Sequence, residues 1–142
     1  MIKNQIKQIL VPMDGSKTSE RALDQAIEMA RATHAKILGL NIIPFLPAEF
    51  MPAVSPYKIY QRKEAGIFLE KAKYRAAKRG ILFTYAILYG SPVEQIIGVA
   101  KKKKVDLVVI GARGKGRVKE LFLGSVSNAV LHKSQIPVLL VK

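Results

Sequence analysis

Apolar residues along this chain gather in five short runs. They fall at residues 5–13, 36–43, 81–89, 105–110 and 137–141. The first run closes on a Pro-Met-Asp-Gly-Ser turn that ends at Ser16, and the second closes on Pro44. Short apolar runs that end in turn residues indicate buried strands. The pattern therefore predicts five strands.

Between the first two runs, apolar residues return every three or four positions, which is the period of a half-buried helix. These residues are Ala22, Leu23, Ala26, Ile27 and Ala30. Ser16 or Ser19 is a suitable N-cap for this helix. Residues 57–79 predict a longer helix that stops at Gly80. Its inward-facing residues are expected to be Ile59, Phe68, Leu69, Ala72 and Ala76.

Two more helices follow. Ser91-Pro92-Val93-Glu94 combines a serine cap, a proline at the first helical position and a glutamate three residues after the cap. A short helix is expected over residues 125–133. In contrast, residues 45–56 hold prolines at 47, 52 and 56, which predicts an irregular loop.

Strands that alternate with helices and are apolar on both faces are typical of a parallel sheet covered on both sides. We expect one α/β domain over residues 1–142, with an open, Rossmann-like sheet of five parallel strands in the order 3-2-1-4-5 and helices on both faces. In that order the first and fourth strands lie side by side, at the point where such sheets bind ligands. The turns after these two strands are the candidate site.

Composition narrows the classes of function. With 49% hydrophobic and 24% charged residues, the chain is far from a disordered composition. The absence of cysteine excludes disulfides, thiolate metal sites and cysteine nucleophiles, and the only histidines, His34 and His132, lie near predicted helix ends. No apolar run is long enough for a membrane span or a signal peptide. We expect a cytoplasmic protein with no membrane contact.

Charge is the unusual feature of the chain. Its 24 Lys and Arg against 10 Asp and Glu give a net charge of +14. Residues 101–142 carry ten of these basic residues and two of the acidic ones, so the excess is concentrated near the C-terminus. Such a charge attracts polyanions without selecting among them.

The turn after the fourth strand is rich in glycine. Gly111, Gly114 and Gly116 lead toward Gly124 and the helix that starts at Ser125. Glycines allow backbone N–H groups to approach an anion, and a helix N-terminus adds unpaired donors and a positive dipole end. Glycine content alone leaves two interpretations open, a phosphate-binding loop and a flexible connection.

Spacing adds a resemblance to a known family. Gly111-x2-Gly114-x9-Gly124-Ser125 matches the G-x2-G-x9-G-[ST] signature of the ATP-binding branch of the universal stress protein family. Residues 9–16 resemble that family's opening strand and aspartate turn, and residues 136–141 resemble its closing segment. The resemblance covers the whole chain. It implies the 3-2-1-4-5 sheet and a homodimer, which we expect to form through the edge strand 137–141.

The resemblance also implies a ligand, ATP. Adenine would lie between the ends of the first, second and fourth strands, and the triphosphate along the glycine loop, with Mg²⁺ or Mn²⁺ bridging its phosphates. The implied binding residues are Pro12, Asp14 and Ile42 around adenosine, Gly111, Arg113 and Gly114 near ribose and phosphates, and Gly124, Ser125, Val126 and Ser127 on the phosphates. No side chain is assigned as a metal ligand or a catalytic group.

One stretch departs from the family pattern. Lys115, Arg117 and Lys119 add cations where the family more often has small or neutral residues, so a more anionic ligand than ATP would also fit. The leading hypothesis is an ATP-binding stress-response regulator, a nucleotide-dependent switch that is at most a slow ATPase. The alternative is a basic protein that binds nucleic acid or polyphosphate. An enzyme is less favoured, because the loop lacks the G-K-[ST] of P-loop hydrolases.

Overall fold

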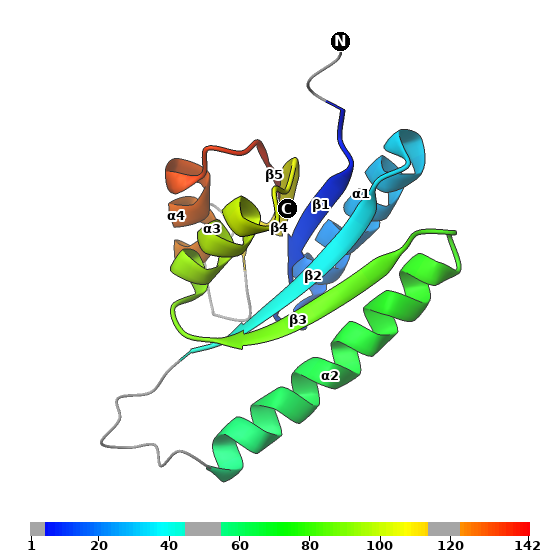
Figure 1. The fold of residues 1–142 in the computed structure, drawn as a ribbon. Coiled ribbons are helices and arrows are strands. Elements are labelled where there is room, and N and C mark those ends of the chain that lie inside the picture. The colour runs from blue at the N-terminus through cyan, green and yellow to red at the C-terminus, as the bar shows by residue number, and fades with distance from the viewer. Residues whose placement is uncertain (1–4, 45–54, 114–122) are drawn as a thin grey trace.

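The strands form one parallel sheet in the order β3-β2-β1-β4-β5 (Figure 1). The computed structural model describes residues 5–44, 55–113 and 123–142. The elements in chain order are β1 (Gln8–Pro12), α1 (Lys17–Thr33), β2 (Lys36–Ile43), α2 (Pro56–Ala77), β3 (Phe83–Tyr89), α3 (Pro92–Lys102), β4 (Leu107–Gly111), α4 (Ser125–Lys133) and β5 (Val138–Val141). The predicted α/β fold and strand order are confirmed.

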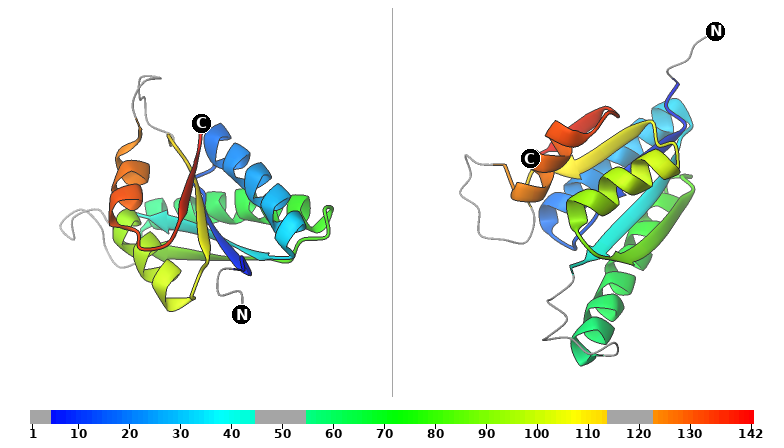
Figure 2. Two further views of the ribbon diagram at one scale, coloured as in Figure 1. Left: turned by 90° about the horizontal axis from the view of Figure 1, so that it is seen from above. Right: turned by 60° about the vertical axis from the view of Figure 1, so that its left-hand side comes forward.

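The helices cover both faces of the sheet (Figure 2). α1 and α2 pack on one face, in a cluster that includes Ile9, Leu23 and Leu69. α3 and α4 pack on the other, in a cluster around Leu10, Ile96 and Val130. Successive residues of a strand point to opposite faces, so the apolar runs of β1 and β4 supply both clusters.

The predicted N-caps have different outcomes. Ser16, rather than Ser19, caps α1, and its Oγ accepts the backbone N–H of Ser19 at 3.1 Å. Ser55 caps α2 in the same way, and Pro56 occupies the first turn of this helix. The prediction that Pro56 belongs to the loop was wrong, because a first-turn residue needs no N–H donor. Ser91 is the N-cap of α3 and Pro92 begins the helix, as predicted, but the Ser91 side chain makes no capping hydrogen bond.

α2 shows one error in the predicted core. Ala65, Leu69, Ala72 and Ala76 form its buried face, whereas Ile59 is 60% exposed. Tyr60, Ile67 and Tyr74 are also exposed. Large apolar residues therefore occur on the exposed side of this helix as well as on its buried side. The spacing of apolar residues therefore marked the wrong side at Ile59.

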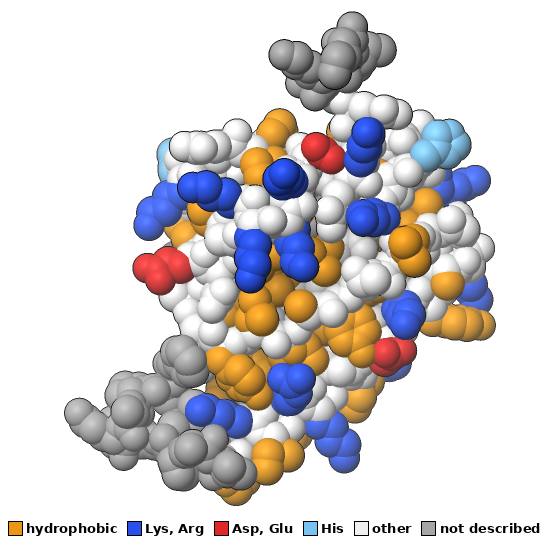
Figure 3. Space-filling view, in the orientation of Figure 1, with side chains coloured by type: hydrophobic (Ala, Val, Ile, Leu, Met, Phe, Trp, Pro, Cys, Tyr) orange, Lys and Arg blue, Asp and Glu red, His pale blue; other side chains and the backbone are white. Residues whose placement is uncertain are grey.

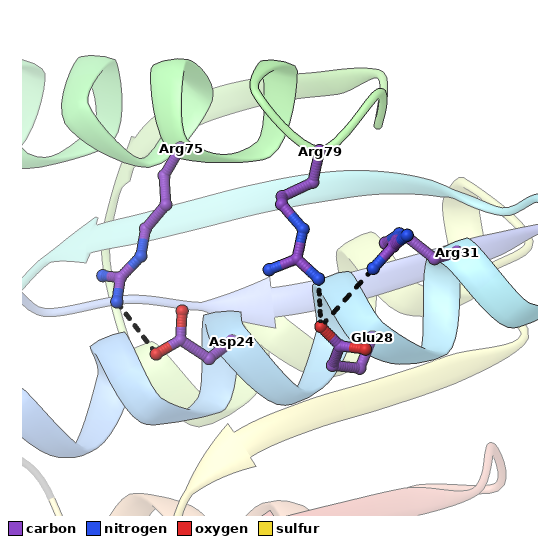
Figure 4. A network of polar contacts seen from close by, with 5 residues as sticks. All are labelled: Asp24, Glu28, Arg31, Arg75 and Arg79. Atoms are coloured by element: carbon purple, nitrogen blue, oxygen red, sulfur yellow. Dashed lines mark hydrogen bonds and ion pairs between the residues drawn. The ribbon is translucent and has the colours of Figure 1, made fainter.

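Ion pairs join α1 to α2 and to the turn that follows α2 (Figure 4). Arg75 contacts Asp24 at 2.9 Å, and Arg79 contacts Glu28. Arg31 approaches the same Glu28 oxygen at 4.0 Å. All of these side chains are about half exposed, so each pair adds at most about 1 kcal/mol to stability.

None of the helices within residues 5–44, 55–113 and 123–142 has both the length and the apolarity needed to cross a bilayer.

Candidate functional site

A cavity of about 400 Å³ opens where the strands end. Its walls come from the turns after β1 and β4, the end of β2, the N-terminal turns of α1, α3 and α4, and one residue of α2. Because parallel strands all end at the same edge of a sheet, segments far apart in sequence meet here. The volume lies within the range of small-molecule sites, roughly 300–1,000 Å³.

The turn after β1 is held by two neighbours. Met13 donates its backbone N–H to the Leu40 carbonyl at 2.8 Å, which continues the pairing of β1 with β2. The buried Asn41 side chain donates its Nδ2 to the Met13 carbonyl at 2.8 Å. One carboxylate oxygen of Asp14 accepts the Ser16 N–H at 2.9 Å. Asp14 is thus fixed at the cavity with its carboxylate in a defined place.

Gly111 is the last residue of β4 and packs closely against α1. A Cβ atom built there would lie 2.8 Å from the Thr18 methyl group and 3.1 Å from the Thr18 carbonyl carbon. Thr18 is buried in the first turn of α1, so it has little room to move. A glycine at this position is therefore required by internal packing, whatever the cavity binds.

The start of α4 provides backbone donors. Gly124 is the N-cap, and its own N–H bonds the Ala112 carbonyl at 2.7 Å. The Ser127 hydroxyl donates to the same carbonyl at 2.7 Å, which ties α4 to the turn after β4. The first intrahelical bond runs from the Asn128 N–H to Gly124, so the N–H groups of residues 125–127 have no acceptor within the helix. A helix N-terminus of this kind favours an anion.

Nine of the ten residues assigned from the sequence line this one cavity. They are Pro12, Asp14, Ile42, Gly111, Arg113, Gly124, Ser125, Val126 and Ser127. The tenth, Gly114, lies outside the described residues, as do Lys115, Arg117 and Lys119. The three signature segments therefore converge, and their role in binding stays a prediction.

Sequence reasoning missed several lining residues. Asn41 was a detectable signal, since it is the one amide in the apolar run of β2 and it is buried. Pro92 and Ile96 reach the cavity because α3 begins beside the end of β2. Gln61 lines the cavity from α2, and no spacing rule would have brought it there.

The cavity is lined by both apolar and polar groups. Pro12, Ile42 and Ile96 are apolar surfaces suited to a flat ring. Asp14 offers an acceptor, and Arg113 with the α4 amides offers donors and positive charge. Within the described segments, no group of three or more acidic or histidine side chains could hold a metal.

The sequence of this chain is similar to those of known proteins. The sequence profile of the universal stress protein family matches residues 5–142. Universal stress protein YxiE of Bacillus subtilis is 34% identical over 94% of this chain and 97% of its own. Universal stress protein MJ0531 of Methanocaldococcus jannaschii is 32% identical over 99% of this chain and 84% of its own.

Solved structures show the same fold. UspA of Lactobacillus plantarum superposes with a TM-score of 0.89 at 22% identity, covering 97% of this chain and 99% of its own. A universal stress protein in complex with cAMP has a TM-score of 0.77 at 28% identity, covering 97% and 98%. A protein from Archaeoglobus fulgidus in complex with dAMP has a TM-score of 0.74 at 23% identity, covering 98% and 99%.

Proposed function

This chain belongs to the universal stress protein family, and on that premise we propose that it binds an adenine nucleotide, ATP, in the cavity at the ends of β1 and β4. One observation carries the proposal. The Asp14 turn, the Gly111 turn and the first amides of α4 all line the same cavity of about 400 Å³. The cAMP complex of a 28% identical protein supports the adenine nucleotide class.

The cavity has groups for each part of the ligand. The adenine ring would pack between Pro12 and Ile42, and the Asp14 carboxylate would accept a hydrogen bond from the nucleoside. The phosphates would lie at the N-terminus of α4, near Arg113, where amides and the helix dipole favour negative charge. Mg²⁺ or Mn²⁺ would bind phosphate oxygens, consistent with the single carboxylate among the lining residues.

Hydrolysis should be slow. Phosphoryl transfer requires an oriented water and a positioned base. Asp106 is too far to act, because its carboxylate accepts the N–H groups of Lys7 and Gln8 where β1 begins. Glu120, the other carboxylate near the loop in sequence, lies outside the described residues. We propose a switch that reports nucleotide occupancy, with turnover well below the roughly 1–100 s⁻¹ typical of kinases. Phosphate release under saturating ATP and magnesium measures this rate.

Two substitutions at one residue test the phosphate site. Ser125→Pro removes an amide donor from the first turn of α4, and the helix should accept it because Gly124 has ψ 155°, as a residue before proline requires. A bond from an amide to a charged group contributes about 1.5–3 kcal/mol. We expect ATP to bind Ser125→Pro about tenfold or more weakly in calorimetry, whereas Ser125→Ala, which keeps the amide and loses only the hydroxyl, should lose less affinity. Equal affinity for both variants would mean that the phosphates bind elsewhere. If the parent protein binds no adenine nucleotide, the proposal is wrong.

A second candidate function is contact with a polyanion such as nucleic acid. Lys101, Lys102, Lys103 and Lys104 are all exposed at the end of α3, and the chain carries +14. Salt separates the two candidates. Duplex DNA binding falls with a slope of about −0.9 per phosphate contacted in a double-logarithmic plot. Binding of one nucleotide in a cavity should depend on salt far less.

A further inference from the structure

A second hollow, of about 530 Å³, opens at the opposite end of the strands. It lies where β1, β2 and β3 begin and where α1 and α2 end. Its floor contains the buried residues Ala30, Ala35 and Ile81. Its lining residues are Lys7, Ala30, Arg31, His34, Ala35, Lys36, Arg79, Gly80, Ile81 and Leu82. Among the residues that the structure describes, none lines both this hollow and the proposed nucleotide cavity.

The hollow has one sign of charge. Five of its lining residues are Lys, Arg or His, and none of the ten, all in the described part of the chain, is acidic. In Figure 3, Lys and Arg side chains are spread over the visible face, and few acidic side chains lie among them. A concave surface with one sign of charge concentrates the field and attracts counter-charged ligands.

Helix stabilisation accounts for only part of this charge. Arg31 lies in the last turn of α1, where a cation favours the helix dipole. Lys7 and Lys36 have no such role, because one precedes β1 and the other begins β2. The acidic residue near Lys7 is Asp106, whose carboxylate bonds backbone N–H groups and does not line the hollow.

Glu28 restrains the two arginines. Its Oε1 atom contacts Arg79 and lies 4.0 Å from Arg31, as Figure 4 shows. One carboxylate thus faces two guanidinium groups, so the three groups together keep a net positive charge. Because these side chains are about half exposed, the ion pairs are weak and a stronger anion can compete for the arginines.

We propose that this hollow binds a compact anion that carries several phosphate groups, at a site separate from the nucleotide cavity. Arginine matches phosphate oxygens with paired donors, and lysine adds point charges. Lys7, Lys36, Arg31 and Arg79 would bind the phosphates, and His34 would donate a ring N–H. The volume of the hollow, about 530 Å³, lies within the range of small-molecule sites, roughly 300–1,000 Å³. This inference goes beyond the nucleotide proposal and does not depend on it.

Inorganic tripolyphosphate is a suitable probe, with calorimetry for affinity and backbone amide NMR for position. We expect saturable binding, with shifts at residues 34–36 and 79–82. The double variant Lys7→Gln, Lys36→Gln should bind about tenfold or more weakly, a loss that corresponds to about 1.4 kcal/mol or more. Both side chains are exposed, so the fold should be unaffected.

Two controls remove the same charge elsewhere. Lys71→Gln with Lys73→Gln lies on the exposed part of α2, and Lys102→Gln with Lys103→Gln lies at the same end of the sheet on its other face. Neither pair lines the hollow. Both controls should bind tripolyphosphate as the parent does, within about twofold, because exposed charges at a distance are screened by salt.

A gain of affinity completes the test. Glu28→Gln should release Arg31 and Arg79 and strengthen tripolyphosphate binding severalfold. Glu64→Gln, which makes the same charge change at an exposed position of α2, should not. Three results would overturn the proposal. One is an equal loss of tripolyphosphate affinity in all three lysine variants, and another is a set of amide shifts confined to residues 123–127. The third is displacement of tripolyphosphate by duplex DNA whose own affinity falls in the Lys102 and Lys103 variant.

Discussion

Gly39 in β2 leaves space for the ring of Phe83 on the neighbouring strand β3. A Cβ built on it would lie 2.5 Å from Cζ of Phe83, and Phe83 is buried on β3. Because the ring has little room to move, we expect Gly39→Ala to lower the free energy of unfolding by about 1–3 kcal/mol in urea denaturation. Phe83→Leu in the same chain should recover part of that loss, because it removes the atoms in conflict. Strictly additive effects would contradict this packing.

Tyr85 provides a pH-dependent contact. Its hydroxyl donates to a Glu70 carboxylate oxygen at 2.6 Å. This hydrogen bond, with some burial and the charge of Glu70, raises the pKa of Tyr85 above its ordinary value of 10.0. The bond needs the protonated phenol, so its stabilisation is complete below about pH 10 and is lost as the pH rises through the folded-state pKa.

An ultraviolet titration of the phenolate tests this contact. The difference between the parent and Tyr85→Phe isolates Tyr85 from the other tyrosines. Its pKa should fall toward 10.0 in Glu70→Gln, which removes the charged acceptor. An unchanged pKa in that variant would mean that Glu70 does not cause the shift.

Residue roles were only partly predictable from the sequence. Asp14 could be placed because it follows an apolar run and matches a family motif. The motif assigned Gly111 to ligand approach, whereas contact with Thr18 already requires a glycine there. That contact depends on how α1 packs on β4, and neither spacing nor composition carries this information.

Two helical glycines are open to improvement. A Cβ atom added to Gly66 in α2 or to Gly98 in α3 would have open space around it, with no atom within 4 Å. Alanine would cost no packing there and would reduce the conformational entropy lost on folding. We expect Gly66→Ala and Gly98→Ala each to stabilise the fold by about 0.5–1 kcal/mol, seen as a higher melting temperature. Gly80→Ala, with φ +75°, should instead destabilise it.

Element prediction succeeded where one signal was dominant. The bounds of β2 and α4 agree with the sequence-based ranges, because Pro44 ends one and a glycine-serine step begins the other. α2 was harder, because its exposed face carries Tyr60, Ile67 and Tyr74 as well as lysines. Apolar spacing cannot separate a core-facing side from an exposed side when both carry large apolar residues.

At the scale of the molecule, β5 is an edge strand and a candidate site of self-association. Val108 donates to the Pro137 carbonyl and Ala112 to the Val141 carbonyl, so the N–H groups of Val138 and Leu140 point away from β4. An unpaired edge of this kind favours pairing with a second chain. We expect a homodimer through β5 that becomes stronger with salt, since each subunit carries +14.

Sedimentation equilibrium at micromolar concentration tests the dimer. Leu140→Pro removes an outward N–H while leaving the bonds to β4 in place, so it should shift the protein toward monomer. Circular dichroism should show that the fold persists. A monomeric parent, or a variant that dimerises as the parent does, would exclude pairing through β5.

The candidate site was predictable as far as topology determines it. The order 3-2-1-4-5 alone places the turns after β1 and β4 together, and the nine assigned residues in the described segments do line one cavity. Gln61 was not predictable, because its position depends on how far α2 extends past the end of the sheet.

The two ends of α1 contribute to two different cavities. Ser19, near its start, lines the cavity where the strands end, and Ala30 and Arg31, near its end, line the basic hollow where the strands begin. A helix is a stiff rod, so a ligand that displaces one end along the axis also displaces the other. Thermodynamic linkage makes any such effect mutual: the factor by which tripolyphosphate changes the affinity for ATP must equal the factor by which ATP changes the affinity for tripolyphosphate.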